Sequence, residues 1–178
     1  LEREVPPTEK NIETSKKGQY RIKDNFLAFW FRFVYPMRSF IESDHPEIAM
    51  AKLKTGFIPN HVGYVYEDIC RQKMWELNVQ GKLPFLFDRV GRWWGGKDTE
   101  IDIVAIDTTD RSKIIFGECK FHQNVPMQLS ELHQLKEKAA VVPWGNANRD
   151  EYFALFCISG YSEDLQQLAQ EDSHLLLM

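Results

Sequence analysis

Hydrophobic positions from residue 60 onward follow two different periods. Short runs rich in β-branched and aromatic residues have the length and composition of β-strands. We predict strands at residues 85–90, 100–107, 113–121, 152–159 and 175–178. Amphipathic helices are predicted at residues 62–77 and 126–140 and after Ser162, a residue type that favours the start of a helix. This order of elements indicates an α/β fold with a mixed central sheet flanked by helices.

The N-terminal residues show a different pattern. Residues 1–23 predict a β-hairpin that turns near Gly18. Two strands alone cannot bury a hydrophobic core, so we expect the hairpin to belong to a larger unit that precedes it. The first residue is Leu1 rather than Met, which also suggests a fragment or a processed chain. The mixed-sheet domain is then expected to occupy residues 59–178.

A helical connector is predicted between the hairpin and this domain, over residues 24–58. Its first helix carries an apolar stripe at i, i+3, i+4 and i+7, made of Phe26, Phe29, Trp30 and Phe33. Pro36 is expected to end or kink this helix, and residues 46–54 predict a second short helix. We expect the aromatic stripe to pack in a core or against another domain rather than to stack on bases.

The composition is that of an ordinary globular protein. Apolar types make up 43% and charged types 27% of the 178 residues, which excludes a disordered or fibrous chain. The longest apolar run, residues 152–158, is far shorter than the ~18 residues of a membrane-spanning helix. No charged-then-apolar signal opens the sequence, so we expect a cytoplasmic protein without a membrane partner. Cys70, Cys119 and Cys157 form no CxxC pair, which excludes a zinc ribbon and argues against a disulfide framework.

Charge is unevenly distributed along the chain. Residues 1–97 carry 16 Lys and Arg against 12 Asp and Glu, whereas residues 98–178 carry 6 against 14. The net charge of −4 is therefore the sum of +4 in the first part and −8 in the second. A polyanion would be attracted to the first part, and a divalent cation would suit the second.

The candidate chemistry lies at the ends of two neighbouring predicted strands. Glu118 and Lys120 are two positions apart, so their side chains share one face at the end of the strand at residues 113–121. Asp102 lies near the start of the preceding strand, which the turn at residues 108–112 makes an antiparallel neighbour. Both carboxylates then reach one edge of the sheet and form an oxygen-lined site suited to Mg²⁺ or Mn²⁺. Lys120 can favour deprotonation of a metal-bound water or stabilise charge on a phosphate.

Glu67 is a fourth candidate, on the helix predicted at residues 62–77. The apolar stripe of this helix consists of Val62, Tyr66, Ile69, Cys70 and Leu77. Glu67 lies at the margin of the stripe, about 100° from its centre, and is expected to reach over the edge of the sheet. The alternative is that Glu118 and Lys120 belong to a solvated strand face, as alternating charged residues usually do.

Residues 91–97 superficially match a phosphate-binding loop of the form GxxxxGK. Asp98 stands where Ser or Thr would have to contact Mg²⁺, and a strand rather than a helix follows, so we expect a connection between two strands instead. Trp93 and Trp94 either stack on bases or pack against the helical connector, and we favour packing.

The four candidate residues, in this order, resemble the PD-(D/E)XK nuclease superfamily, which has the restriction-endonuclease-like fold. The matched pattern is Glu67 on the first core helix, Asp102 on the second strand and Glu118-x-Lys120 on the third, with Ile101 in place of the family's proline. The resemblance implies that Asp102 and Glu118 bind one or two Mg²⁺ ions, with Glu67 as an accessory ligand. It also implies that Lys120 assists the attack of water on a phosphodiester of DNA.

Several short sequences are similar to one particular family, the C-terminal domain of unknown function of archaeal and bacterial AAA-type ATPases. They are YRIKDNF at 20–26, FWFRF at 29–33, YEDIC at 66–70, GRWW at 91–94 and FGECK at 116–120. In that family a P-loop ATPase and a winged helix precede this domain. The resemblance therefore implies both as partners in the same polypeptide, and the hairpin at residues 1–23 as the wing of a truncated winged helix. Two other functions stay open, namely a catalytically silent module that binds DNA or a partner and regulates the ATPase, and an oligomerisation domain that uses the Trp and Phe surface.

Overall fold

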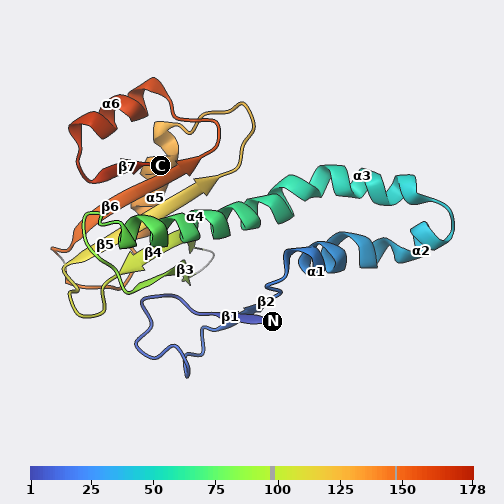
Figure 1. Cartoon of the computed structure of the whole chain (residues 1–178), viewed down its shortest axis with the longest axis horizontal. Helices are drawn as coiled ribbons and strands as arrows, with labels where there is room; N and C mark the ends of the chain where they lie inside the picture. The colour runs from blue at the N-terminus through green and yellow to red at the C-terminus, as the bar shows by residue number, and fades with distance from the viewer. Residues whose placement is uncertain (97–98, 147) are drawn as a thin grey trace.

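The computed structural model describes residues 1–96, 99–146 and 148–178. Its centre is a five-stranded sheet in the order β3-β4-β5-β6-β7 (Figure 1). The strands are β3 (Arg89–Gly95), β4 (Thr99–Ile106), β5 (Lys113–Lys120), β6 (Asp150–Cys157) and β7 (Leu175–Leu177). β3, β4 and β5 pair antiparallel, whereas β5, β6 and β7 pair parallel. The mixed sheet predicted from the sequence is therefore confirmed.

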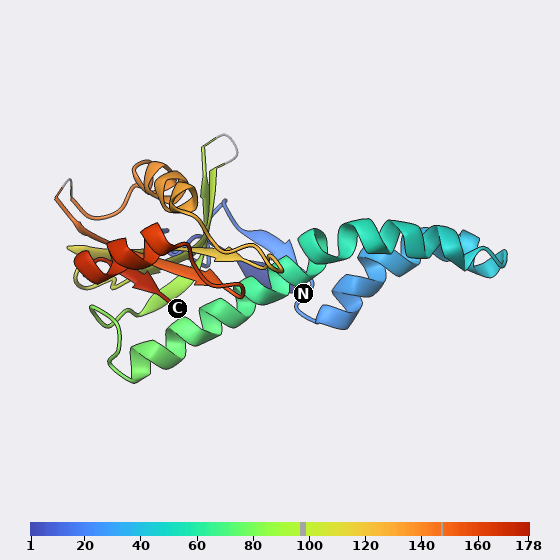
Figure 2. The same cartoon turned by 90° about the horizontal axis from the view of Figure 1, so that it is seen from above.

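Helices cover both faces of the sheet (Figure 2). They are α4 (Gly63–Val79), α5 (Leu129–Ala139) and α6 (Glu163–Glu171). Successive residues of β4 alternate between two hydrophobic cores, because neighbouring strand side chains point to opposite faces. Ile103 and Ala105 pack in the core under α4, whereas Val104 and Ile106 pack in the core under α5 and α6. The sheet is thus the middle of three layers.

The starts of α5 and α6 follow from capping. Ser162 caps α6 as predicted, since its hydroxyl accepts a hydrogen bond from the backbone N–H of Leu165. α5 begins at Leu129 rather than near Pro126, and the carboxylate of Glu131 reaches back to the backbone N–H of the residue before α5, at 3.0 Å. Within the described ranges, every helix is too short or too polar to cross a bilayer.

The strand predicted at residues 85–90 is wrong, because β3 begins only at Arg89. Phe87 is buried, and its backbone N–H and C=O each pair with the side-chain amide of Asn78 at 3.0 Å. Since Asn78 satisfies both backbone groups, Phe87 can bury its ring without a strand partner. The connection predicted at residues 91–97 is also wrong, because residues 91–95 belong to β3. Residues 97 and 98, where the end of that motif falls, lie outside the described residues.

The fully buried face of α4 shares only Cys70 with the predicted stripe, while Tyr66 and Leu77 are half-buried. Cys70, Met74 and Asn78 are buried and follow one another at a spacing of four residues. Ile69, which was predicted on this face, is 54% exposed. One residue corresponds to about 100° of rotation, so the side chain next to Cys70 turns away from the sheet.

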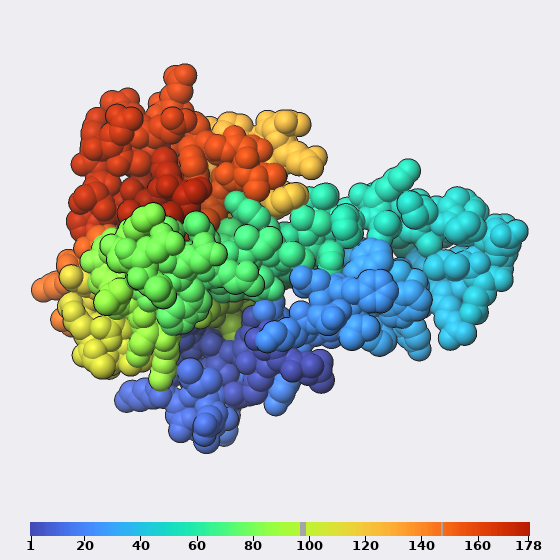
Figure 3. Space-filling model, viewed as in Figure 1, coloured from blue at the N-terminus to red at the C-terminus, as the bar shows by residue number. Residues whose placement is uncertain are grey.

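Residues 24–58 form a helical arm that stands away from the sheet domain (Figures 1 and 3). Its elements are α1 (Asn25–Phe29), the π-helical η1 (Trp30–Val34), the 3-10 turn η2 (Tyr35–Met37), α2 (Arg38–Glu42) and α3 (Pro46–Phe57). The predicted helical connector is confirmed, although Pro36 lies within η2 and does not end the helical path. α3 is longer than predicted and continues without a break through the π-helical η3 (Ile58–Val62) into α4.

Only part of the aromatic stripe of the arm is shielded, since Phe29 and Phe33 are half-buried. Phe29 and Phe33 pack edge-on against Phe57 of α3, with ring centroids 5.9 and 6.2 Å away. Phe26 and Trp30 are exposed in this chain. The arm therefore presents exposed aromatic rings, as β2 and α4 also do at Tyr20, Tyr64 and Trp75.

The N-terminal hairpin (residues 1–23) is confirmed, and it lies against the sheet domain. Its strands are β1 (Glu2–Glu4) and β2 (Gln19–Arg21), paired antiparallel. The indole N–H of buried Trp93 donates to the hydroxyl of Thr8 in the hairpin loop at 3.0 Å. Gly91 admits this loop, because a Cβ there would lie 3.2 Å from Pro7. Trp93 thus packs as favoured, but the predicted partner is wrong, since it contacts the hairpin rather than the helical connector.

Candidate active site

The pairing of β4 and β5 brings two of the predicted carboxylates together. Ile103 pairs with Gly117, so the preceding residue of β4, Asp102, comes level with Glu118. A Cβ on Gly117 would lie 2.9 Å from the Cβ of Ile103, so glycine permits the close approach of the strands here. The Oδ2 atom of Asp102 accepts a hydrogen bond from the backbone N–H of Cys119 at 2.8 Å. The start of β4 therefore meets the end of β5, as the alternation and the turn predicted.

A β-bulge re-aims the side chain of Asp102. From Gly91 to Trp93 the chain of β3 advances two residues, while their partners on β4, Val104 and Ile101, are three residues apart. Asp102 and Ile103 of β4 therefore lie opposite the single residue Arg92 of β3. As a result Ile101 and Val104 pack in the same core, and strict alternation is broken between them. Bulges turn side chains in this way next to functional sites.

Glu118 is held by two ammonium groups. Its side chain is only 7% exposed, its Oε1 lies 2.7 Å from the Nζ of Lys120, and its Oε2 lies 3.1 Å from the Nζ of Lys138. Lys138 comes from the last turn of α5 and was missed by the sequence analysis. Its position three residues after the buried Leu135 places it beside the buried face of the helix, which is the signal that would have found it.

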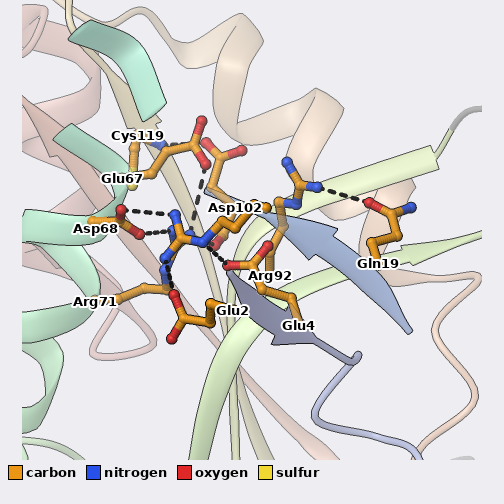
Figure 4. A network of polar contacts seen from close by, with 10 residues as sticks. Glu2, Glu4, Gln19, Glu67, Asp68, Arg71, Arg92, Asp102 and Cys119 are labelled. Carbon is orange, nitrogen blue, oxygen red and sulfur yellow. Dashed lines mark hydrogen bonds and ion pairs between the residues drawn. The ribbon is translucent and has the colours of Figure 1, made fainter. Parts of the chain in front are cut away.

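Glu67 joins the site from the opposite layer. Its carboxylate lies 3.6 Å from the guanidinium of Arg71, one helical turn further along α4. Arg71 also donates to the backbone C=O of Asp102 at 3.0 Å, which ties α4 to the bulged part of β4. In Figure 4 the carboxylates of Glu67 and Asp102 point into the same space. Arg71 is a second residue that the sequence analysis missed.

Burial and neighbouring negative charge disfavour the ionised forms of Asp102 and Glu67. Burial, and then the charge of Glu118, raise the pKa of Asp102 to about 6, although the N–H of Cys119 works against this rise. Burial, and then the charge of Asp102, raise the pKa of Glu67 to about 7, although Arg71 opposes it. Raised carboxylate pKa values mean that the ionised forms are poorly stabilised in the fold. A bound cation would stabilise them and lower these pKa values.

Lys120 stays protonated in this arrangement. Burial alone would lower the pKa of its ammonium group, but the ion pair with Glu118 outweighs burial and raises the pKa. A protonated lysine can donate to a phosphate oxygen but cannot take a proton from water. The structure therefore favours charge stabilisation over water activation as the chemistry of Lys120.

Asp102 and Glu118 have the donor atoms that a Mg²⁺ or Mn²⁺ ion would require. Mg²⁺ is usually bound by one or two carboxylates and keeps several waters, so two oxygen ligands from adjacent strands fit it. Among the residues that the structure describes, no three His, Cys, Asp or Glu side chains lie close enough to share one ion.

All four residues predicted from the sequence lie at one end of the sheet. Glu118 contacts Lys120 directly, Asp102 contacts the backbone between them, and Glu67 reaches Asp102 through Arg71. The solvated strand face considered as the alternative is not what the structure shows for Glu118, because this carboxylate is buried.

The comparisons with known proteins identify relatives without a known activity. Residues 30–139 match the sequence model of the DUF234 family, described as archaeal and bacterial proteins of unknown function. An uncharacterized protein of Methanocaldococcus jannaschii is 35% identical over 156 residues, which cover 87% of this chain and 34% of that protein. The chain thus spans about a third of the length of this relative. No solved structure matches the chain.

Proposed function

This chain belongs to the DUF234 family of archaeal and bacterial proteins, and we propose that residues 59–178 form a Mg²⁺- or Mn²⁺-dependent nuclease that hydrolyses phosphodiester bonds of DNA. The observation that carries the proposal is the meeting of Asp102 and Glu118 beside Lys120 at one end of the sheet. Buried carboxylates with a raised pKa next to a protonated lysine are a costly arrangement that a purely structural role does not require.

Asp102 and Glu118 would hold the metal ion, with Glu67 behind them. When bound, such an ion polarises a phosphate oxygen and lowers the pKa of a coordinated water, which supplies the attacking hydroxide. The carboxylates would be deprotonated by the same binding event, which offsets the cost of their mutual repulsion.

The lysines act on the phosphate. While Glu118 pairs with Lys120 and Lys138, both ammonium groups are occupied. If Glu118 held the ion, the ammonium groups of Lys120 and Lys138 would be left to pair with the phosphate and to stabilise the charge that develops on its oxygens. Glu118 would thereby couple metal binding to the release of positive charge for the substrate.

The domain would act as the C-terminal part of a larger cytoplasmic ATPase. The relative from M. jannaschii is about three times as long as the matched region, which leaves room for further domains. The sequence resemblance to AAA-type ATPases supports an ATPase and a winged helix as partners in the same polypeptide, with the N-terminal hairpin as the wing.

A second function is favoured by the ion pairs of Glu118. Both of its carboxylate oxygens are already neutralised by lysines, so the site is electrostatically complete at this residue without a cation. A catalytically silent module that binds DNA or a partner and regulates the ATPase would retain such a site for stability.

Cleavage assays with matched variants separate the two functions. A supercoiled plasmid and linear DNA are incubated with the chain in Mg²⁺, Mn²⁺ or EDTA. Lys120→Ala and Asp102→Asn are compared with Lys113→Ala at the other end of β5 and Asp107→Asn just after β4. The nuclease function is supported if cleavage depends on the metal ion and is lost in Lys120→Ala and Asp102→Asn but not in the two control variants. Cleavage that is unchanged in all four variants refutes it. Absence of cleavage, together with altered ATP turnover when residues 59–178 are deleted from the full protein, supports the regulatory module.

A further inference from the structure

A cavity adjoins the candidate active site. It has a volume of about 450 Å³ and lies between β2 of the N-terminal hairpin, the base of the arm and the first turns of α4. Glu67 and Arg71 line it from α4, so the cavity and the carboxylate site share a wall. Pockets that bind small ligands have volumes of roughly 300–1,000 Å³. The cavity therefore has room for a ligand of the size of one nucleotide.

Two of the four arginines in its wall are neutralised by a carboxylate. Arg21 of β2 lies 2.7 Å from one oxygen of Asp68, and Arg71 binds the other oxygen. These contacts fasten the N-terminal hairpin to α4, as the network in Figure 4 shows. Burial alone would raise the pKa of Asp68, but the hydrogen bonds from the two arginines lower it, so Asp68 stays ionised. Arg21 and Arg71 are structural parts of the cavity.

Among residues 1–96, 99–146 and 148–178, the other two arginines form no ion pair with a carboxylate, although Arg92 is close enough to Glu67 to lower its pKa. Arg32 donates to the backbone C=O of Asn60, and Arg92 donates to the side-chain oxygen of Gln19 at 3.1 Å. The Nε atom of Arg92 is buried and has no hydrogen-bond partner within the described part of the chain. A guanidinium group without an acidic partner in a cavity wall is suited to bind a phosphate, which it can contact through two parallel N–H groups.

The same wall presents aromatic rings. Tyr64 and Phe31 line the cavity and are 43% and 51% exposed, and the guanidinium of Arg32 lies 5.5 Å from the centroid of the Tyr64 ring. His61 also lines it, and burial, followed by the charge of Arg32, lowers its pKa, so the imidazole is neutral at pH 7. Exposed aromatic rings next to arginines are the surface on which single-stranded nucleic acids stack their bases.

We infer that the cavity holds an unpaired nucleotide of a single-stranded DNA segment, with its phosphate on Arg32 and Arg92 and its base against Tyr64. The inference rests on the proposed nuclease function, because it names the form of DNA that is presented to the carboxylates next door. In a duplex both faces of an internal base are covered by its neighbours, so the Tyr64 ring can stack only on a base that has left the stack. The substrate class is therefore DNA with a single-stranded end, gap or flap.

Binding measured without metal tests this inference apart from cleavage. A fluorescein-labelled oligothymidylate of about 12 nucleotides, within the roughly 4–16 nucleotides that single-strand sites occupy, is titrated with the chain in EDTA. Fluorescence anisotropy should show at least about tenfold tighter binding of this strand than of a blunt duplex of equal length. Tyr64→Ala should weaken strand binding about tenfold. Arg32→Gln should lower the slope of log K against log salt concentration by about 0.7.

Matched controls come from the outer part of the arm. Tyr35→Ala and Arg38→Gln change the same residue types outside the cavity wall and should bind the strand within about twofold of the unmodified chain. Circular dichroism of each variant checks that the helices are retained. Equal affinity for strand and duplex would overturn the inference, as would unchanged affinity in Tyr64→Ala.

The two proposals fail in different ways. Metal-dependent cleavage with no preference for single-stranded DNA and no effect of Tyr64→Ala would overturn the cavity assignment and leave the nuclease standing. Strand binding that depends on Tyr64 and Arg32, without cleavage in Mg²⁺ or Mn²⁺, would overturn the nuclease and support the cavity as the binding site of a silent module.

Discussion

Replacing Asp102 by asparagine should stabilise the folded protein, although it removes a residue of the candidate active site. Burial and the charge of Glu118 raise the pKa of Asp102 from 3.8 to about 6. At about 1.4 kcal/mol per pKa unit, the fold disfavours the ionised carboxylate by about 3 kcal/mol at pH 7. Asparagine carries no charge, and its amide oxygen can still accept the hydrogen bond from the N–H of Cys119. We therefore expect the free energy of unfolding to rise by about 2–3 kcal/mol.

The sign of the pH dependence is fixed by the direction of the shift. The folded-state pKa of Asp102 lies above the unfolded value, so the penalty is absent where both states are protonated and grows as the pH rises from about 4 through about 6. It is complete at pH 7 and about half as large at pH 5. The stabilisation by Asp102→Asn should follow the same course.

Urea unfolding in EDTA at pH 7 and pH 5 measures this difference. Asp107→Asn is the control, because Asp107 is not buried and hydrogen bonds from Thr109 lower its pKa, so its replacement should not stabilise the fold. Equal or lower stability of Asp102→Asn at pH 7 would show that the carboxylates do not repel one another. The electrostatic account of the site would then be wrong.

Three further predictions concern the site and its surroundings. Mg²⁺ added at pH 7 should raise the melting temperature of the unmodified chain but not that of Asp102→Asn, because only a folded state that binds the ion is stabilised. Differential scanning calorimetry measures both melting temperatures. Asn78→Ala should lower the free energy of unfolding by about 2–3 kcal/mol, because two backbone groups of Phe87 lose their partners in a buried setting; a loss below about 0.5 kcal/mol in urea would contradict this. Arg21→Gln should speed trypsin cleavage within the N-terminal hairpin, and Arg38→Gln on the arm should not. The pKa of Asp68 is lowered in the fold. The stability that Arg21 and Asp68 provide together is therefore present above the unfolded-state pKa near 3.8 and is lost as the pH falls through the lower folded-state value. The stability difference between Arg21→Gln and the unmodified chain should accordingly shrink in acid.

Local rules were sufficient to predict where the candidate residues meet. The alternation of side chains relates Glu118 to Lys120, and the short turn before β5 makes β4 its antiparallel neighbour, which carries Asp102 to the same end. Each of these steps depends on residues close together in the sequence. The same is true of Ser162 as the cap of α6.

Contacts between distant segments were beyond these rules. The bulge at Asp102 depends on the pairing with β3, and the pairing of Asn78 with Phe87 replaces the strand expected there. Lys138 reaches Glu118 only because α5 packs across β5, and Trp93 found its partner in a loop more than eighty residues away. In each case the apolar pattern shows that a side chain is buried but not which segment covers it.

The unbroken helical path from α3 through η3 to α4 makes the arm a lever on Glu67. At 1.5 Å per residue, about 30 Å of helix separates Pro46 at the tip from this carboxylate. Beyond Glu67, the buried Cys70 and Met74 hold α4 against the sheet, so a sideways displacement of the tip would have to be taken up between Pro46 and Cys70. A domain that bound the tip of the arm could therefore shift the carboxylate of Glu67 by a small fraction of the displacement of the tip, without contacting the sheet.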